Sequence, residues 1–360
     1  MRKSVLSFLV FIFVSCSTND EGVSLLSDVP VTTLNEIIRF DTIGDNYLSH
    51  IGYTSIALDD GNILVPDRQL GTLFKVDSSG ELIETIGRRG NGPGEFQDIS
   101  FLNKSAFGNS LIYDQMNQKV IVLNNQGQYY AEFLIPPNRP PGSLIEVYEV
   151  EVQQYLMVFQ TFDYMINEDA EQVSNLVIYN REQEIVSPSK TIKSSPYARR
   201  TGGGGGMRAP FVASDLLAYD NTTADVYLYR SDSHNIAQLD VSLDTIQIST
   251  FDLEPEKLTK AESDSLEIEN QEYWESLQKI LPENKALADQ MMVDQNKIIW
   301  LKLNHTSNYQ QWLTISDQGE LLQVIQIPKN SILTHISENH LGVRLDNATF
   351  ALYEYPEILN

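Results

Sequence analysis

The sequence is poor in cysteine and poor in basic residues. One cysteine, Cys16, occurs among 360 residues, so no disulfide bond can form within the chain. Lysine and arginine together number 25 against 49 aspartates and glutamates, which gives a net charge of −24. Nucleic-acid binding requires clustered positive charge to neutralise phosphates. We therefore expect no nucleic acid among the partners of this protein.

Motifs for metal binding and for nucleophilic catalysis are also lacking. The sequence contains no HExxH, no cysteine cluster and no GxSxG elbow. Two of its five histidines, His335 and His340, lie five residues apart across a strand turn, and we expect their side chains to point apart. We therefore predict no cofactor, no metal ligand and no catalytic residue.

Aromatic residues are plentiful, whereas long helical stretches are scarce. The chain has 17 tyrosines and 14 phenylalanines, and 42% of its residues are apolar against 21% charged. This balance favours a folded core over disorder. Because aromatic residues favour strands, the composition predicts a mostly β protein.

The first sixteen residues indicate export and a lipid anchor. Arg2 and Lys3 precede an apolar run over residues 5–14, which is too short to span a bilayer as a helix but suits a signal peptide. The run ends in Phe-Val-Ser-Cys, which resembles a lipobox. We predict a lipoprotein signal peptide over residues 1–15 and lipidation of Cys16. The alternative is a free cysteine in an uncleaved anchor or a buried helix.

The segment after Cys16 places the protein at the cell envelope. We expect residues 16–31 to form a flexible tether. The acidic residues just after the cysteine suit either a surface-export signal or a plain tether. The predicted location is therefore the outer membrane, reached through the lipid anchor, on its periplasmic or its surface side.

A short turn motif recurs along the chain. The sequences VDSSGEL at 76–82, LNNQGQY at 123–129 and ISDQGEL at 315–321 each place Asp or Asn and then Gly between two alternating strands. Asp and Asn bond their own backbone in turns, and Gly supplies a positive φ. Gly80 and Gly127 are 47 positions apart (127 − 80). Such a period is typical of propeller blades.

The repeats predict an all-β, six-bladed β-propeller over residues 32–360. We expect its blades at about 52–87, 98–135, 144–192, 210–252, 287–327 and 332–355. The last unit has only three strands. We infer that residues 34–40 supply its fourth strand and so remove the exposed sheet edges. A helical insertion at about 254–286 is expected between blades four and five, as a cap over the central channel or as a lid for a partner.

The loop IGRRGNGPGEF at 86–96 carries a family resemblance. It resembles the GxxGxGPGxF loop of six-bladed β-propeller lipoproteins related to NHL repeats. The resemblance implies the fold and an envelope location but implies little about activity. From the residues alone, we expect the glycines to permit tight turns and Phe96 to fill a space between two blades.

Several of the few arginines fall in loops that share one face of such a propeller. We predict a binding site there for an anionic or glycan-like ligand, because arginine suits carboxylates, phosphates and acidic sugars. Its candidate residues are Arg68, Arg88, Arg89, Arg199, Arg200, Arg208 and His305. The alternative is that carboxylates of the acidic insertion simply pair with these arginines. The five glycines at 202–206 are expected to form a flexible loop.

The predicted function is that of an envelope-anchored binding or interaction lipoprotein with a glycan or an envelope protein as partner. One alternative is a metal-dependent propeller enzyme of lyase or lactonase type acting on a carbohydrate-like substrate. Another is a structural scaffold in an outer-membrane complex. The sequence favours a non-enzymatic role and leaves the ligand unidentified.

Overall fold

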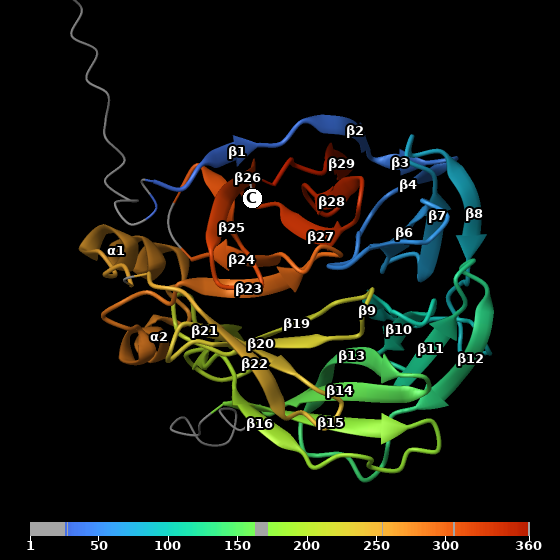
Figure 1. Ribbon diagram of the computed structural model, residues 1–360, viewed down its shortest axis with the longest axis horizontal. Coiled ribbons are helices and arrows are strands. Elements are labelled where there is room, and N and C mark those ends of the chain that lie inside the picture. Colours follow the sequence, from blue (N-terminus) through green and yellow to red (C-terminus); the bar gives the residue numbers. More distant parts are fainter. Residues whose placement is uncertain (1–25, 27, 163–171, 254, 305–306, 359–360) are drawn as a thin grey trace, which may run out of the picture.

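The protein is a ring of six β-sheets, or blades, as Figure 1 shows. A computed structural model describes residues 26, 28–162, 172–253, 255–304 and 307–358. The predicted signal peptide, Cys16 and most of the predicted tether lie outside the described residues. Within the described part of the chain, no helix is long and apolar enough to cross a membrane.

The blades follow one another along the chain, each running from an inner strand to an outer strand. Blade one comprises β5 (Ile56–Ala57), β6 (Ile63–Asp67), β7 (Thr72–Val76) and β8 (Leu82–Ile86). Blade two comprises β9 (Ile99–Lys104), β10 (Ser110–Asp114), β11 (Lys119–Leu123) and β12 (Tyr129–Leu134). Blade three comprises β13 (Ser143–Glu151), β14 (Gln154–Gln160), β15 (Val173–Asn180) and β16 (Lys190–Lys193).

The remaining blades bring the chain back to its beginning. Blade four comprises β19 (Leu216–Tyr219), β20 (Val226–Arg230), β21 (Asn235–Leu239) and β22 (Thr245–Thr250). Blade five comprises β23 (Ala288–Val293), β24 (Ile299–Leu303), β25 (Tyr309–Ile315) and β26 (Leu321–Pro328). Blade six contains β27 (Ile332–Ile336), β28 (His340–Arg344) and β29 (Phe350–Glu354). The six predicted units are therefore confirmed.

Two features explain why these segments form strands: the recurring turn between them and the burial of each blade by its neighbours. Asp77 accepts hydrogen bonds from the backbone N–H groups of Ser79 and Glu81, and Gly80 takes a φ of +79°. This is the predicted Asp–Gly turn. The middle strands β6 and β7 are buried along their whole length, because neighbouring blades cover both of their faces. Phe96 is fully buried in the cluster between blades one and two.

The N-terminal segment completes the ring. β2 (Glu36–Phe40) pairs antiparallel with β29, as the sequence predicted. The Tyr353 hydroxyl donates to Glu36 at 3.0 Å, and the rings of Phe40 and Phe350 lie 5.5 Å apart. β1 (Val31–Thr33) adds in parallel to β26, which the sequence did not indicate. One short segment thus joins blades five and six (Figure 1).

Two small hairpins and two helices decorate the connections. β3 (Thr42–Ile43) pairs with β4 (Asn46–Tyr47), and β17 (Tyr197–Arg199) pairs with β18 (Gly206–Arg208) around the glycine run. The insertion forms α1 (Lys260–Glu269) and α2 (Trp274–Ile280). A capping box between Thr259 and Glu262 begins α1.

The expectation that the insertion caps the central channel is wrong. In Figure 1 both helices lie at the rim of the ring. Leu277 of α2 is fully buried against Ala198 and Ala209 of the β17–β18 hairpin region. The apolar stripe of the insertion is therefore covered by this hairpin, and no described residue of the insertion lines the cavity on the axis.

Blades six and one also meet through a buried polar cluster. The Thr334 hydroxyl donates to the carbonyl of Gly342 at 2.9 Å, so it accepts from the Ser55 hydroxyl at 2.6 Å. That contact uses the only proton of the Ser55 hydroxyl. The Ser55 oxygen also lies 2.6 Å from His335 Nδ1, so Nδ1 must be the donor in this second hydrogen bond. The hydrogen-bond network thus assigns the Nδ1–H tautomer to His335.

The two histidines of blade six lie together, so the expectation that they point apart is wrong. Antiparallel pairing sets His335 opposite Gly342, two residues from His340, which puts both rings on one face of the sheet. The ring centroids are 5.4 Å apart. A side chain at position 342 would collide with the His335 ring, so glycine is required there.

Truncating the aromatic contact at the ring closure should destabilise the protein strongly. Phe350 is fully buried between blades six and one. We expect Phe350→Ala to lower the free energy of unfolding by about 3–5 kcal/mol, because it leaves a cavity in this interface. Ile37→Ala, in the same β2–β29 sheet but 50% exposed, is the matched control and should change stability by less than about 0.5 kcal/mol. Urea denaturation measures both, and equal effects would contradict the closure role.

His335 should make stability depend on pH. Burial first, and then the neighbouring His340 and Lys104, lower its pKa to about 3. The unfolded chain takes up this proton below its ordinary pKa of about 6.5, whereas the folded protein does not. The contribution of His335 to the free energy of unfolding is therefore fully present above about pH 6.5 and is lost as the pH falls toward 3.

The variant His335→Gln tests this dependence because glutamine keeps a donor for Ser55 and does not titrate. We expect it to lose less unfolding free energy than the wild type between pH 7.5 and pH 5 in urea titrations. Leu352→Ala, another buried position of the same interface, should be less stable at both pH values but keep the wild-type pH dependence. An unchanged pH dependence in His335→Gln would refute the assignment.

Candidate functional site

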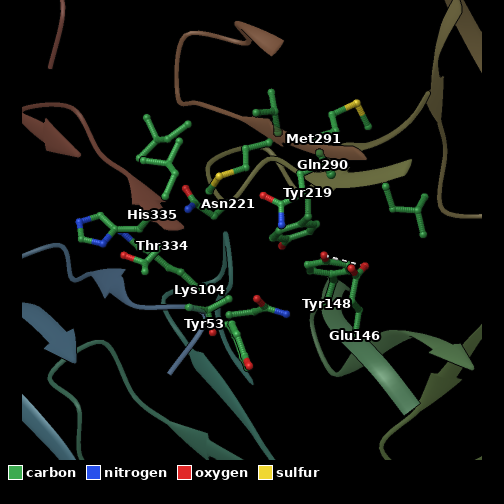
Figure 2. Close-up of a pocket in the computed structure, with 18 of the residues that line it drawn as sticks. Tyr53, Lys104, Glu146, Tyr148, Tyr219, Asn221, Gln290, Met291, Thr334 and His335 are labelled. Carbon is green, nitrogen blue, oxygen red and sulfur yellow. Dashed lines mark hydrogen bonds between the residues drawn. The ribbon is translucent and has the colours of Figure 1, made fainter. Parts of the chain in front are cut away.

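A cavity of about 940 Å³ runs along the axis of the ring. All six inner strands line it, through residues that include Ile56, Leu102, Glu146, Leu217, Gln290 and Leu333. Figure 2 shows side chains from several blades around this space. Pockets of such size, with aromatic and convergent polar groups, are the usual binding sites of small molecules.

Two tyrosines form an aromatic platform between blades three and four. Tyr148 of β13 stacks on Tyr219 of β19, with ring centroids 5.0 Å apart and planes 17° from parallel. The Tyr219 hydroxyl donates to the backbone carbonyl of Glu149 and accepts from the N–H of Ala106. The second tyrosine is therefore fixed in place, and it holds the first by stacking (Figure 2).

Glu146 lies beside this platform, deep in the molecule but partly open to the cavity. It accepts a hydrogen bond from the Tyr148 hydroxyl at 2.9 Å. No lysine or arginine of the described residues forms an ion pair with it. Burial raises the pKa of Glu146 to about 7, against the smaller lowering effect of the Tyr148 hydrogen bond. Removal of a carboxyl from water without a cationic partner is the physical cause of this shift.

The two lysines and the arginine that line the cavity, in contrast, have partners. Lys104 pairs with Asp59 at 2.7 Å, and Lys302 pairs with Asp289 at 3.2 Å. Arg208 donates to the Ser195 hydroxyl at 2.9 Å and to the Asp289 carbonyl at 3.3 Å. Glu146 is thus a carboxylate of the described cavity wall with no ion-pair partner. Glu338, which also lines the cavity, has no ion pair among the described residues either, but its side chain is exposed.

The predicted arginines fall into two groups on opposite sides of the ring. Arg68, Arg88 and Arg89 belong to loops of blade one, whereas Arg199, Arg200 and Arg208 belong to the β17–β18 hairpin before blade four. Arg208 lines the axial cavity, and the other five are absent from its wall. His305 lies outside the described residues.

Three of these arginines pair with nearby carboxylates. Arg68 contacts Asp98 at 2.9 Å, and Arg88 contacts Glu95 of its own loop at 2.7 Å. Arg200 contacts Glu272, in the insertion, at 2.7 Å. The backbone N–H of Arg199 also donates to Ser276 of the insertion. The pairing considered as an alternative from the sequence therefore occurs at Arg200, and a ligand-binding role for the whole group stays a prediction.

The sequence did not single out Glu146, Tyr148 or Tyr219. They belong to inner strands, and the axis of a propeller is approached by the inner strand of every blade. The sequence could have indicated these three residues only through their type, because they are polar or aromatic residues in the first strand of a repeat unit. That signal is weak, because β13 carries bulges that change which of its side chains share a face.

The alternative of a metal-dependent enzyme needs a set of metal ligands. Among the residues that the structure describes, no group of three or more histidine, cysteine, aspartate or glutamate side chains could hold a metal ion. The described wall of the cavity thus offers no set of ligands for a metal ion.

Comparison with solved structures finds distant likenesses. They include virginiamycin B lyase from Staphylococcus aureus, 8% identical with a TM-score of 0.47 over 89% of this chain and 99% of that chain. A gluconolactonase from Xanthomonas campestris is 10% identical with a TM-score of 0.45 over 86% and 87% of the two chains. Regucalcin, a calcium-binding protein from Agrobacterium tumefaciens, is 10% identical with a TM-score of 0.46 over 92% and 98%. No inference about activity rests on likenesses this distant.

Comparison with protein families gives a clear assignment. No curated protein matches the chain. A family model described as a 6-bladed beta-propeller matches residues 31–311, which include β1 and extend into β25 of blade five. The match and the ring of six blades agree, and the chain belongs to this 6-bladed beta-propeller family.

Proposed function

We propose that the protein is an envelope-anchored binding protein that holds a small, polar, glycan-like ligand in its axial cavity. The cavity carries this proposal, because its volume of about 940 Å³ suits a small organic molecule. The stacked Tyr148 and Tyr219 offer an apolar surface, and side chains such as Asn103 and Asn221 offer donors and acceptors. A sugar has the same combination of apolar and hydroxyl-bearing surface.

The arginine-bearing loop face supports an anionic ligand less well than the cavity supports a polar one. Arg68, Arg88 and Arg200 already contact carboxylates. An anionic ligand would have to displace these partners. The two arginine groups also lie on opposite sides of the ring, so a small ligand cannot contact both.

The anchor part of the proposal rests on the sequence. The charged start, the apolar run and the terminal Ser-Cys pair of residues 1–16 all fit a lipoprotein signal peptide. Attachment through Cys16 and the following residues would hold the propeller at the membrane surface. No described contact favours the enzyme or the scaffold over a binding protein.

Blocking the cavity should abolish ligand binding. Gln290 lines the cavity and is exposed to it, so Gln290→Trp should fill part of the space without disturbing the core. A thermal-shift screen of sugars, sugar acids and amino sugars should yield a ligand that stabilises the wild type by about 2.7 kcal/mol at a hundred times its Kd. We expect this gain to disappear in Gln290→Trp.

The matched control is Ile246→Trp, which adds the same side chain to the outer strand β22, where Ile246 is 59% exposed. It should keep the full ligand response. A ligand whose effect persists in Gln290→Trp would place the binding site outside the cavity and contradict the proposal.

Replacing the single cysteine should release the protein from the membrane. In Cys16→Ala no thiol remains for acylation, so we expect the expressed protein to lose labelling by radioactive palmitate and to leave the outer-membrane fraction. The variant Ser17→Ala, next to the cysteine, serves as control and should remain labelled. Membrane association of Cys16→Ala equal to that of the wild type would show that the anchor is not a lipid on this residue.

A further inference from the structure

When Glu146 is ionised, its carboxylate and the two tyrosine hydroxyls beside it have no free proton to donate. The Tyr148 hydroxyl uses its proton on Glu146, so its oxygen remains as an acceptor. The Tyr219 hydroxyl uses its proton on the carbonyl of Glu149. When ionised, the Glu146 carboxylate is itself an acceptor with two oxygens, and one of them has no partner among the described residues. A complementary ligand group must therefore donate.

The charges of the cavity point the same way. Lys104 and Lys302 are each held by an aspartate, and Arg208 donates to neighbouring oxygens. No lysine or arginine of the described wall is thus left to compensate Glu146, and burial lowers the pKa of both histidines that line the cavity, His335 and His340. A carboxylate removed from water is stabilised by a cation close to it. The missing counter-charge is one that a ligand can supply.

The aromatic platform adds a third preference. Both Tyr148 and Tyr219 line the cavity next to this carboxyl. Electron-rich aromatic faces attract cations within about 6 Å of the ring centroid. An organic ammonium group offers three N–H donors and a positive charge on an apolar frame, so one ligand group meets all three conditions.

We propose that the ligand of the axial cavity carries a protonated amine, which binds between the Glu146 carboxylate and the Tyr148–Tyr219 platform. This inference rests on the proposed function and names the chemistry of its ligand. The amine donates to the open oxygen of Glu146, while the polar remainder of the ligand extends along the cavity toward Asn221 and Gln290.

Ligand affinity should then depend on pH through Glu146. Its strand neighbour Tyr148 faces it, Tyr219 of β19 lies behind Tyr148, and Lys104 of β9 is occupied by Asp59. The tyrosine hydroxyls stay protonated at neutral pH because burial raises the pKa of both well above the ordinary value. An ammonium ligand requires the ionised carboxylate, and the pKa of Glu146 is about 7. Affinity should be constant well above pH 7 and fall by about tenfold per pH unit below it.

Matched pairs of probes test the proposal. Glucamine and sorbitol differ by one ammonium group in place of one hydroxyl, and so do tyramine and 4-(2-hydroxyethyl)phenol. Both amines stay protonated between pH 6 and pH 8. We expect the amine of at least one pair to bind the wild type at pH 8 at least tenfold more tightly than its hydroxyl partner, as measured by calorimetry or ligand-observed NMR.

Three variants locate the effect. Glu146→Gln keeps an acceptor for Tyr148 but removes the charge, so the preference for the amine and its loss of affinity toward pH 6 should both vanish. Gln290→Trp should abolish binding of every probe. Glu84→Gln, a change of the same kind on the exposed outer strand β8, should behave as the wild type. A cooperative melting transition in the absence of probe would show that each of the three variants folds.

The outcomes separate this inference from the proposed function. Equal binding of amine and hydroxyl, lost in Gln290→Trp, would leave the cavity as the binding site and overturn the ammonium assignment. An amine preference that survives Glu146→Gln would also overturn it. Failure of all four probes to bind the wild type would reject the ammonium site, whereas the cavity itself is judged by the sugar screen and the Gln290→Trp variant described above.

Discussion

Pairing of β2 with β29 is the contact on which the rest of the molecule depends. Blade six contributes three strands from its own segment, so without β2 the sheet would end at an uncovered edge. No disulfide can hold the two ends of the chain together, because the sequence has one cysteine. Backbone hydrogen bonds, the Phe40–Phe350 contact and the parallel pairing of β1 with β26 join the ends instead.

The axial cavity exists because the ring is complete. Each blade contributes its inner strand to the wall, and the positions of these strands relative to the axis follow from how the blades pack. The cluster of Ser55, Thr334 and His335 joins the first and last inner strands. The blades that carry Glu146 and Tyr219 lie on the far side of the ring from this closure. Ser55, Thr334 and His335 themselves line the cavity, so loosening the closure would change the cavity wall directly as well as the positions of the opposite blades.

The blades could be predicted from the sequence because their turns are set by local chemistry. An aspartate that bonds the next backbone N–H groups, followed by a glycine with positive φ, forms the same turn wherever it occurs. The candidate site could not be predicted in this way. His335 and His340 share a face because of the register of their hairpin, and Glu146 follows a bulge in β13. Neither register nor bulges are encoded by residue spacing alone.

The surface arginines and Glu146 differ in how much their charges affect the free energy of folding. An exposed pair such as Arg88 with Glu95, in which the arginine side chain is 81% exposed, contributes little to stability and is screened by salt. A carboxyl enclosed by protein without a cation is different, because its desolvation opposes folding unless it binds a proton. An apolar side chain of similar volume at position 146 would avoid that cost. The carboxyl is therefore hard to explain by the stability of the propeller, and a ligand that brings its own positive charge into the cavity would offset the cost.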